Sequence, residues 1–233
     1  MGILTGVEYD ALMLSLKVAI CSAVTSLPIA VAVAVVLARH SFPGKSLVDG
    51  LVHLPLILPP VVTGYILLLT LGQRGVIGEW LDRVLGIVIA FRWTGAAVAS
   101  AVMGFPLMVQ AIRLSIEGVD RRLEEASSTL GANRAMVFLT VTLPLILPGI
   151  LAGLILSFAR GLGEFGATIT FVSNIPGETQ TIPLAIYSFT QSPTGDVPAL
   201  RLTVISVVLS LAALMLSNRL SLVLKRRLQG RTA

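Results

Sequence analysis

Long apolar stretches recur along the chain, separated by shorter polar ones. A helix that crosses a bilayer needs ~20 mostly apolar residues, because the hydrocarbon core offers no partner for backbone hydrogen bonds. The pattern therefore predicts an all-α membrane protein with about five transmembrane helices. We expect these spans at residues 12–38, 52–71, 94–116, 143–160 or 143–172, and 200–224.

Two of the polar segments have patterns of their own. Residues 76–85 place Trp80 with other apolar side chains on one helical face and Glu79 and Asp82 on the other. This arrangement is typical of a short helix lying at the membrane interface. Residues 173–199 contain four prolines among polar residues, so we expect an extramembrane connection there.

Composition and charge agree with a membrane protein. The chain is 55% hydrophobic and 12% charged, whereas a soluble domain carries about 25% charged residues. Its net charge of +5 does not indicate nucleic-acid binding, because the basic residues flank the apolar spans. Eleven of them fall on one side of the predicted membrane: Arg39, Lys45, Arg113, Arg121, Arg122, Arg134, Arg219, Lys225, Arg226, Arg227 and Arg231. Six fall on the other: Lys17, Arg74, Arg83, Arg92, Arg160 and Arg201. Cytoplasmic loops carry the basic excess, which predicts an N-terminus outside and a C-terminus in the cytoplasm.

Motifs for catalysis and metal binding are missing from the sequence. Cys21 is the single cysteine and lies in the first span, and the two histidines, His40 and His53, flank a short loop. We therefore expect neither a disulfide nor a metal site. Residues 44–46 read Gly-Lys-Ser, but a phosphate-binding loop needs a glycine where Arg39 stands. The sequence predicts a chain that is not an enzyme.

Residues 120–142 interrupt the apolar pattern with a segment that resembles a soluble helical hairpin. Asp120 is suited to cap a first helix, Gly131 to end it in the left-handed conformation, and Asn133 to cap a second helix. A helix of about ten residues is marginal alone in water. The hairpin therefore needs a surface, which is either the protein's own cytoplasmic face or a cytoplasmic partner.

The spacing within this hairpin resembles the EAA motif of permease subunits of ABC importers. Glu125-Ala126-Ser127 is followed after three residues by Gly131, and after nine more by Val141-Thr142-Leu143-Pro144. Ser127 replaces the second alanine of the motif and Val141 an isoleucine. In that family the loop inserts into a groove of each of two ATPase subunits, which bind ATP and Mg²⁺. The resemblance implies that this chain binds no cofactor and docks the ATPase through Glu124, Glu125, Ala126, Ser127, Gly131, Phe138, Leu143 and Pro144.

Longer stretches resemble the molybdate permeases within that family, namely residues 42–68, 105–132 and 158–187. The resemblance implies a single permease domain over residues 8–224, including the hairpin, and a basic cytoplasmic tail at 225–233. It also implies a bacterial inner-membrane location, and partners that include two ATPase subunits, a second copy of the chain, membrane lipid and a periplasmic molybdate-binding protein. Tungstate and sulfate are alternative cargoes.

Two features of the fourth span concern the pathway and helix packing. The segment GLGEFGATIT is either a gate or an interfacial turn in which Glu164 bonds to neighbouring backbone. The candidate gate or pathway residues are Gly163, Glu164, Phe165, Gly166 and Thr168. Small residues recur every four positions at Gly149, Gly153, Ser157 and Gly161. Such a stripe lets another helix approach closely, and that helix belongs either to the same chain or to a second copy in a homodimer.

A stand-alone anion channel or secondary carrier is the alternative class of protein, and a membrane scaffold for a cytoplasmic enzyme is a third. A proton-coupled carrier keeps charged residues inside its spans for a relay, whereas the middles of these spans are almost free of charge. A carrier also has no need of a cytoplasmic hairpin. The sequence therefore favours a permease subunit for an oxyanion, driven by a separate ATPase.

The predicted orientation can be tested with one cysteine. In a Cys21→Ala background, Ser128→Cys in the hairpin should resist an impermeant thiol reagent in intact spheroplasts and react after lysis. Labelling before lysis would place the hairpin outside the cell and contradict the orientation.

Overall fold

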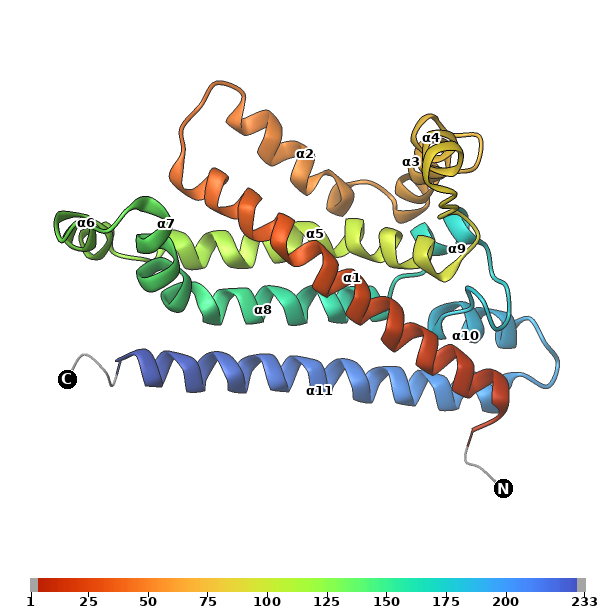
Figure 1. Ribbon diagram of the computed structural model, residues 1–233. Coiled ribbons are helices and arrows are strands. Elements are labelled where there is room, and N and C mark those ends of the chain that lie inside the picture. The colour runs from red at the N-terminus through yellow and green to blue at the C-terminus, as the bar shows by residue number, and fades with distance from the viewer. Residues whose placement is uncertain (1–3, 230–233) are drawn as a thin grey trace.

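The computed structural model describes residues 4–229, and all regular structure in that range is helical. The elements are α1 (Gly6–Arg39), α2 (Lys45–Ile57), α3 (Pro60–Leu71), α4 (Val76–Leu85), α5 (Trp93–Glu117), α6 (Arg121–Thr129), α7 (Arg134–Val137), the π-helical segment η1 (Phe138–Thr142), α8 (Leu143–Leu162), α9 (Gly166–Val172), α10 (Ile182–Thr190) and α11 (Asp196–Gln229). Figure 1 shows α1, α5, α8 and α11 as an elongated bundle, with α2, α3 and α4 on one side of it.

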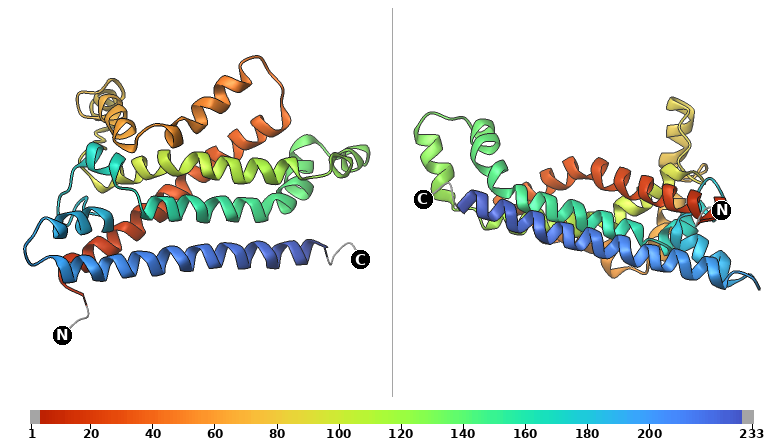
Figure 2. Two further views of the ribbon diagram at one scale, coloured as in Figure 1. Left: turned by 180° about the vertical axis from the view of Figure 1, so that it is seen from behind. Right: turned by 90° about the horizontal axis from the view of Figure 1, so that it is seen from below.

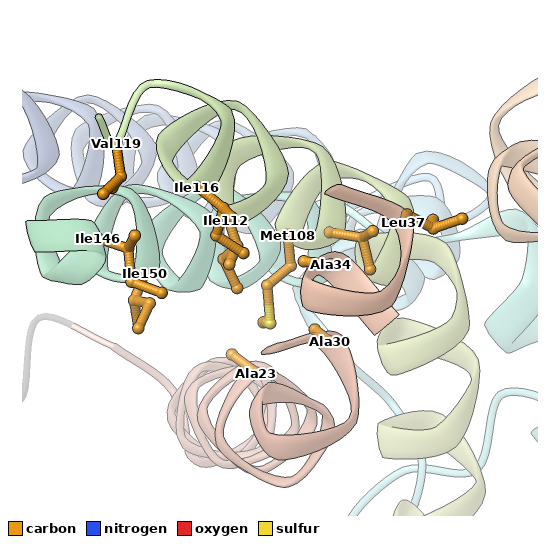
Figure 3. Close-up of a cluster of buried hydrophobic side chains, with 11 residues drawn as sticks. Ala23, Ala30, Ala34, Leu37, Met108, Ile112, Ile116, Val119, Ile146 and Ile150 are labelled. Atoms are coloured by element: carbon orange, nitrogen blue, oxygen red, sulfur yellow. The ribbon is translucent and has the colours of Figure 1, made fainter. Parts of the chain in front are cut away.

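The largest apolar core lies where α1, α5 and α8 meet (Figure 3). Alanines of α1, among them Ala23 and Ala30, face larger side chains of the other two helices, including Met108, Ile112 and Ile146. Lipid tails are as apolar as these side chains, so burial from lipid gives little driving force and close packing has to hold membrane helices together. The match of small to large residues makes these three helices the framework of the fold.

The small-residue stripe of α8 provides the closest of these approaches. A Cβ atom added to Gly149 would lie 2.3 Å from the Cβ of Ser115 in α5. At Gly153 it would lie 3.0 Å from the carbonyl oxygen of Met108, also in α5. Side chains at either glycine would therefore push α5 and α8 apart.

The other half of the stripe also faces helices of the same chain. Ser157 is buried, and its Oγ would lie 2.4 Å from a Cβ added to Gly104 of α5. A Cβ at Gly161 would lie 3.5 Å from the Cα of Ala19 in α1. The stripe thus packs within one chain, and a second copy is not needed to account for it.

Four of the predicted spans correspond to helices that are long and apolar enough to cross a membrane: α1, α5, the continuous run Arg134–Leu162, and α11. The longer alternative for the fourth span, to residue 172, is wrong because α8 ends at Leu162 and α9 begins separately at Gly166. Helix α11 reaches Gln229, so it continues into the predicted tail 225–233. Residues 230–233 of that tail lie outside the described part of the chain.

The second predicted span, at 52–71, is not a single helix. The structure has two helices there, α2 and α3, bent by 114° at a short break. The cause is local, because Pro59 and Pro60 have no amide hydrogen and cannot continue a ladder of i to i−4 hydrogen bonds. Pro60 instead begins α3, where its missing amide costs nothing.

Residues 173–199 contain a helix that the sequence analysis did not foresee. Ile182 and Leu184 of α10 are buried, and α10 packs against α1 and α11. The amide of Ile182 donates a hydrogen bond to Ser15 Oγ of α1 at 2.7 Å. Pro183 lies in the first turn of the helix, so proline marks a helix start here and not a loop.

The predicted interfacial helix is present as α4. Val76, Trp80 and Val84 are exposed, while Arg83 Nη2 donates to Glu79 Oε1 at 2.5 Å on the polar side. The helix therefore has an uncovered apolar face in the described chain. Its position at a membrane surface stays a prediction.

The positions of the first and last helices of the chain fit an odd number of membrane crossings. The first turn of α1 and the last turn of α11 lie at opposite ends of the bundle (Figures 1 and 2). The hairpin formed by α6 and α7 lies at the same end as the last turn of α11 in both figures.

Candidate functional site

The hairpin at residues 120–142 has the caps that its sequence predicts. Asp120 caps α6 and its side chain accepts a hydrogen bond from the amide of Arg122 at 3.0 Å. Asn133 caps α7 in the same way, accepting from the amide of Met136 at 2.8 Å. Gly131 lies between the two helices with φ +88°, in the left-handed region that glycine adopts without a steric penalty. The helix, glycine turn and helix are confirmed.

The second arm of the hairpin differs from the prediction, because it does not end before the span. Helix α7 passes into the π-helical segment η1 and then into α8 without a break, from Arg134 to Leu162. Pro144 has no amide to donate to residue 140, and its ring crowds that carbonyl in an ordinary helix. A widened turn just before Pro144 relieves this crowding. Leu143 and Pro144 are therefore inside a helix that joins the hairpin to the membrane bundle.

The outer face of the hairpin is open. None of the residues of α6 is buried. The side chains of Leu123, Leu130 and Met136 are 50%, 89% and 55% exposed. These apolar side chains lie on a pair of short helices and are uncovered in the described chain.

The predicted docking residues fall into two groups. Those with exposed side chains or backbone are Glu125, Ala126, Gly131 and Pro144. The others are half-buried: Ser127 lies within α6, Phe138 and Leu143 pack against the main core, and Glu124 faces the end of α1. The first group is the more accessible to another chain, because Glu124, Phe138 and Leu143 already have partners in the bundle.

Glu124 makes contacts that the sequence analysis missed. Its Oε1 accepts a hydrogen bond from Arg39 Nη2 at 2.7 Å and another from Thr142 Oγ1 at 2.7 Å. Arg39 is the last residue of α1 and lies 85 positions before Glu124. No local pattern links residues so far apart, so only the tertiary structure reveals the contact.

The GLGEFGATIT segment forms the break between α8 and α9. Glu164 is 2% exposed; its Oε1 accepts from the amide of Ala167 at 2.8 Å, and its Oε2 lies 2.6 Å from Arg160 Nη1. The carboxylate thus satisfies an amide in the first turn of α9, and its charge is paired. This is the arrangement expected for a turn held by backbone bonds.

The remaining candidate gate residues surround that carboxylate. Thr168 is 1% exposed, whereas Gly163 is exposed. Gly166 approaches α3 so closely that an added Cβ would lie 2.8 Å from Pro60 Cβ. The ring of Phe165, half-buried, contacts that of Tyr187 in α10 with centroids 5.4 Å apart. The break therefore brings α3, α8, α9 and α10 together.

Solved structures of ABC transporters share this fold. The crystal structure of a bacterial ABC transporter involved in the import of alginate matches 93% of this chain and 79% of its own chain, with TM-score 0.72 and 18% identity. The structure of the inward-facing MetNI methionine ABC transporter matches 93% of this chain and 94% of its own chain, with TM-score 0.65 and 16% identity. At these identities the likeness concerns the fold alone.

Sequence comparison defines the family. Residues 26–228 match the family of binding-protein-dependent transport system inner membrane components. The chain belongs to that family. It is 56% identical over 225 residues to the molybdenum transport system permease protein ModB of Escherichia coli (strain K12), covering 97% of this chain and 98% of that protein. ModB of Haemophilus influenzae is 56% identical over 227 residues, covering 97% and 99%. The sulfate transport system permease protein CysT of Escherichia coli is 39% identical over 181 residues, covering 78% and 64%.

Proposed function

We propose that this chain is the permease subunit of an ATP-driven importer and forms the membrane pathway for molybdate. The exposed hairpin carries the proposal: it presents uncovered apolar side chains and continues as one helix into the bundle. The choice of molybdate rests on 56% identity to ModB across nearly the whole chain, against 39% to the sulfate permease CysT. Tungstate has the same charge and shape as molybdate and is the alternative cargo.

The proposed assembly contains two copies of this chain and two ATPase subunits, with a periplasmic binding protein that delivers the oxyanion. The hairpin lies in the cytoplasm and the N-terminus outside, as the distribution of basic residues favours. ATP and Mg²⁺ bind to the ATPase. Glu125, Ala126 and Gly131, whose positions on the hairpin are exposed, contact the ATPase groove.

A stand-alone channel or carrier is less well supported. Neither needs an exposed cytoplasmic hairpin whose helix is continuous with a span. Both would nevertheless move anion without an ATPase, and this difference separates the two classes in one assay.

Reconstitution tests the proposal. The chain, its ATPase and its binding protein in proteoliposomes should take up molybdate only with ATP. Gly131→Asp or Glu125→Lys should reduce this uptake by about tenfold or more, the loss expected when a central contact of an interface is removed. Gly86→Asp is the matched control, since Gly86 also has a positive φ at a helix end and open space around it, but lies outside the hairpin. Molybdate movement by the chain alone, or full uptake with Gly131→Asp, would contradict the proposal.

We also propose that the α8–α9 break closes the pathway toward the outside, with Gly163, Gly166 and Thr168 shaping the turn, Glu164 holding it and Phe165 closing it. Phe165→Ala removes the ring that contacts Tyr187 and should raise ATP-independent molybdate leak or basal ATPase activity in the same proteoliposomes. Tyr187→Phe keeps the ring contact and should leave both unchanged. If Phe165→Ala changes neither quantity, Phe165 is not part of a gate.

A further inference from the structure

The hairpin stands away from the bundle on its α1 side. A cavity of ≈ 790 Å³ lies there, and its lining includes Val35 and Arg39 of α1, Ile116 of α5, and Glu124 and Thr142 of the hairpin. Helix α6 has no buried residue, so it is not packed into the bundle. Its capping bonds are internal to the hairpin, and the Arg39 contact is an ion pair that crosses from the hairpin to α1.

The Arg39–Glu124 ion pair lies where three elements meet at one carboxylate oxygen. Glu124 Oε1 of α6 accepts from Arg39 Nη2 at the end of α1 and from Thr142 Oγ1 at the end of η1, each at 2.7 Å. The side chains of Arg39 and Glu124 are 17% and 22% exposed, and Thr142 is buried. The pair is thus partly exposed and lines the cavity, and it bridges α6, α1 and the helix that becomes α8.

We propose that Arg39 is a positioning residue that transmits displacement of the hairpin to α1. This inference rests on the proposed function, in which the ATPase pulls on the hairpin. Helix α8 receives that displacement directly, because it is continuous with the hairpin. Helix α1 also packs against α8 in the main core, and the Arg39–Glu124 pair adds a direct contact between α1 and α6 of the hairpin.

The pair suits coupling better than it suits folding. Partly exposed ion pairs contribute little to stability, and the hairpin keeps both of its capping bonds when Arg39 is replaced. Arg39 variants should therefore fold and bind the ATPase. What they lose is the fixed relation between α6 and α1 during the ATPase cycle.

The test measures ATP hydrolysed per molybdate imported by the reconstituted complex, with the amount of bound ATPase determined in parallel. Arg39→Gln should raise this ratio by about threefold or more while the ATPase stays bound, and Glu124→Gln should also raise the ratio. Thr142→Val removes one of the two hydrogen bonds and should have a smaller effect in the same direction. The charge exchange Arg39→Glu with Glu124→Arg should return the ratio toward that of the unmodified complex.

Arg83→Gln is the matched control, because it breaks an Arg–Glu pair on α4, far from the hairpin (Figure 1). It should leave the ratio unchanged. Three results would overturn the proposal. The ratio could be unchanged in Arg39→Gln, the Arg39→Gln complex could lose bound ATPase in step with uptake, or the charge exchange could fail to restore the ratio. If the unmodified complex shows no ATP-driven uptake, the proposed function itself has failed, which is a distinguishable result.

Discussion

The close approach of α8 to α5 is the contact on which the rest of the structure depends. At Gly149 there is no room for a single methyl group against Ser115, and at Gly104 none against Ser157. Apolar side chains gain little by leaving lipid, so the fit of small residues between backbones has to replace the hydrophobic effect of a soluble core. Helix α1 completes the unit by packing its alanines on the same two helices.

Helix α8 connects the two candidate sites, which are the hairpin and the α8–α9 break. One helix runs from Arg134 in the hairpin to Leu162, where the Glu164 turn begins. Beyond that turn, α9 packs against α3, so the two broken segments of the chain cover each other. Irregular backbone at membrane depth is tolerated only where protein or a water-filled cavity surrounds it. The α8–α9 break meets this requirement with its buried Glu164 and Thr168 and with contacts such as Gly64 against Ala167, whereas Pro59 and Pro60 at the α2–α3 bend are exposed in the described chain.

Local signals account for what the sequence could predict. Apolar length placed α5 within one residue at each end, and the caps Asp120 and Asn133 act within three residues of their own position. Hydropathy could not show the bend at Pro59, because apolar residues continue on both sides of it. It also could not show α10, where prolines suggested a connection. The Glu124 and Arg39 contact depends on the packing of α1 beside the hairpin, so it required the three-dimensional structure.

The thermal stability of variants at the α5–α8 contact tests this central claim most directly. Gly149→Ala should lower the Tm of the purified chain by several degrees, the cost of overpacking. Gly50→Ala, at an open position of α2, should leave the Tm unchanged or raise it, since alanine favours a helix. Ser115→Gly removes the opposing Cβ, so the double variant should lose less than the sum of the two single losses. A Gly149→Ala chain as stable as Gly50→Ala, or strictly additive losses, would contradict the account.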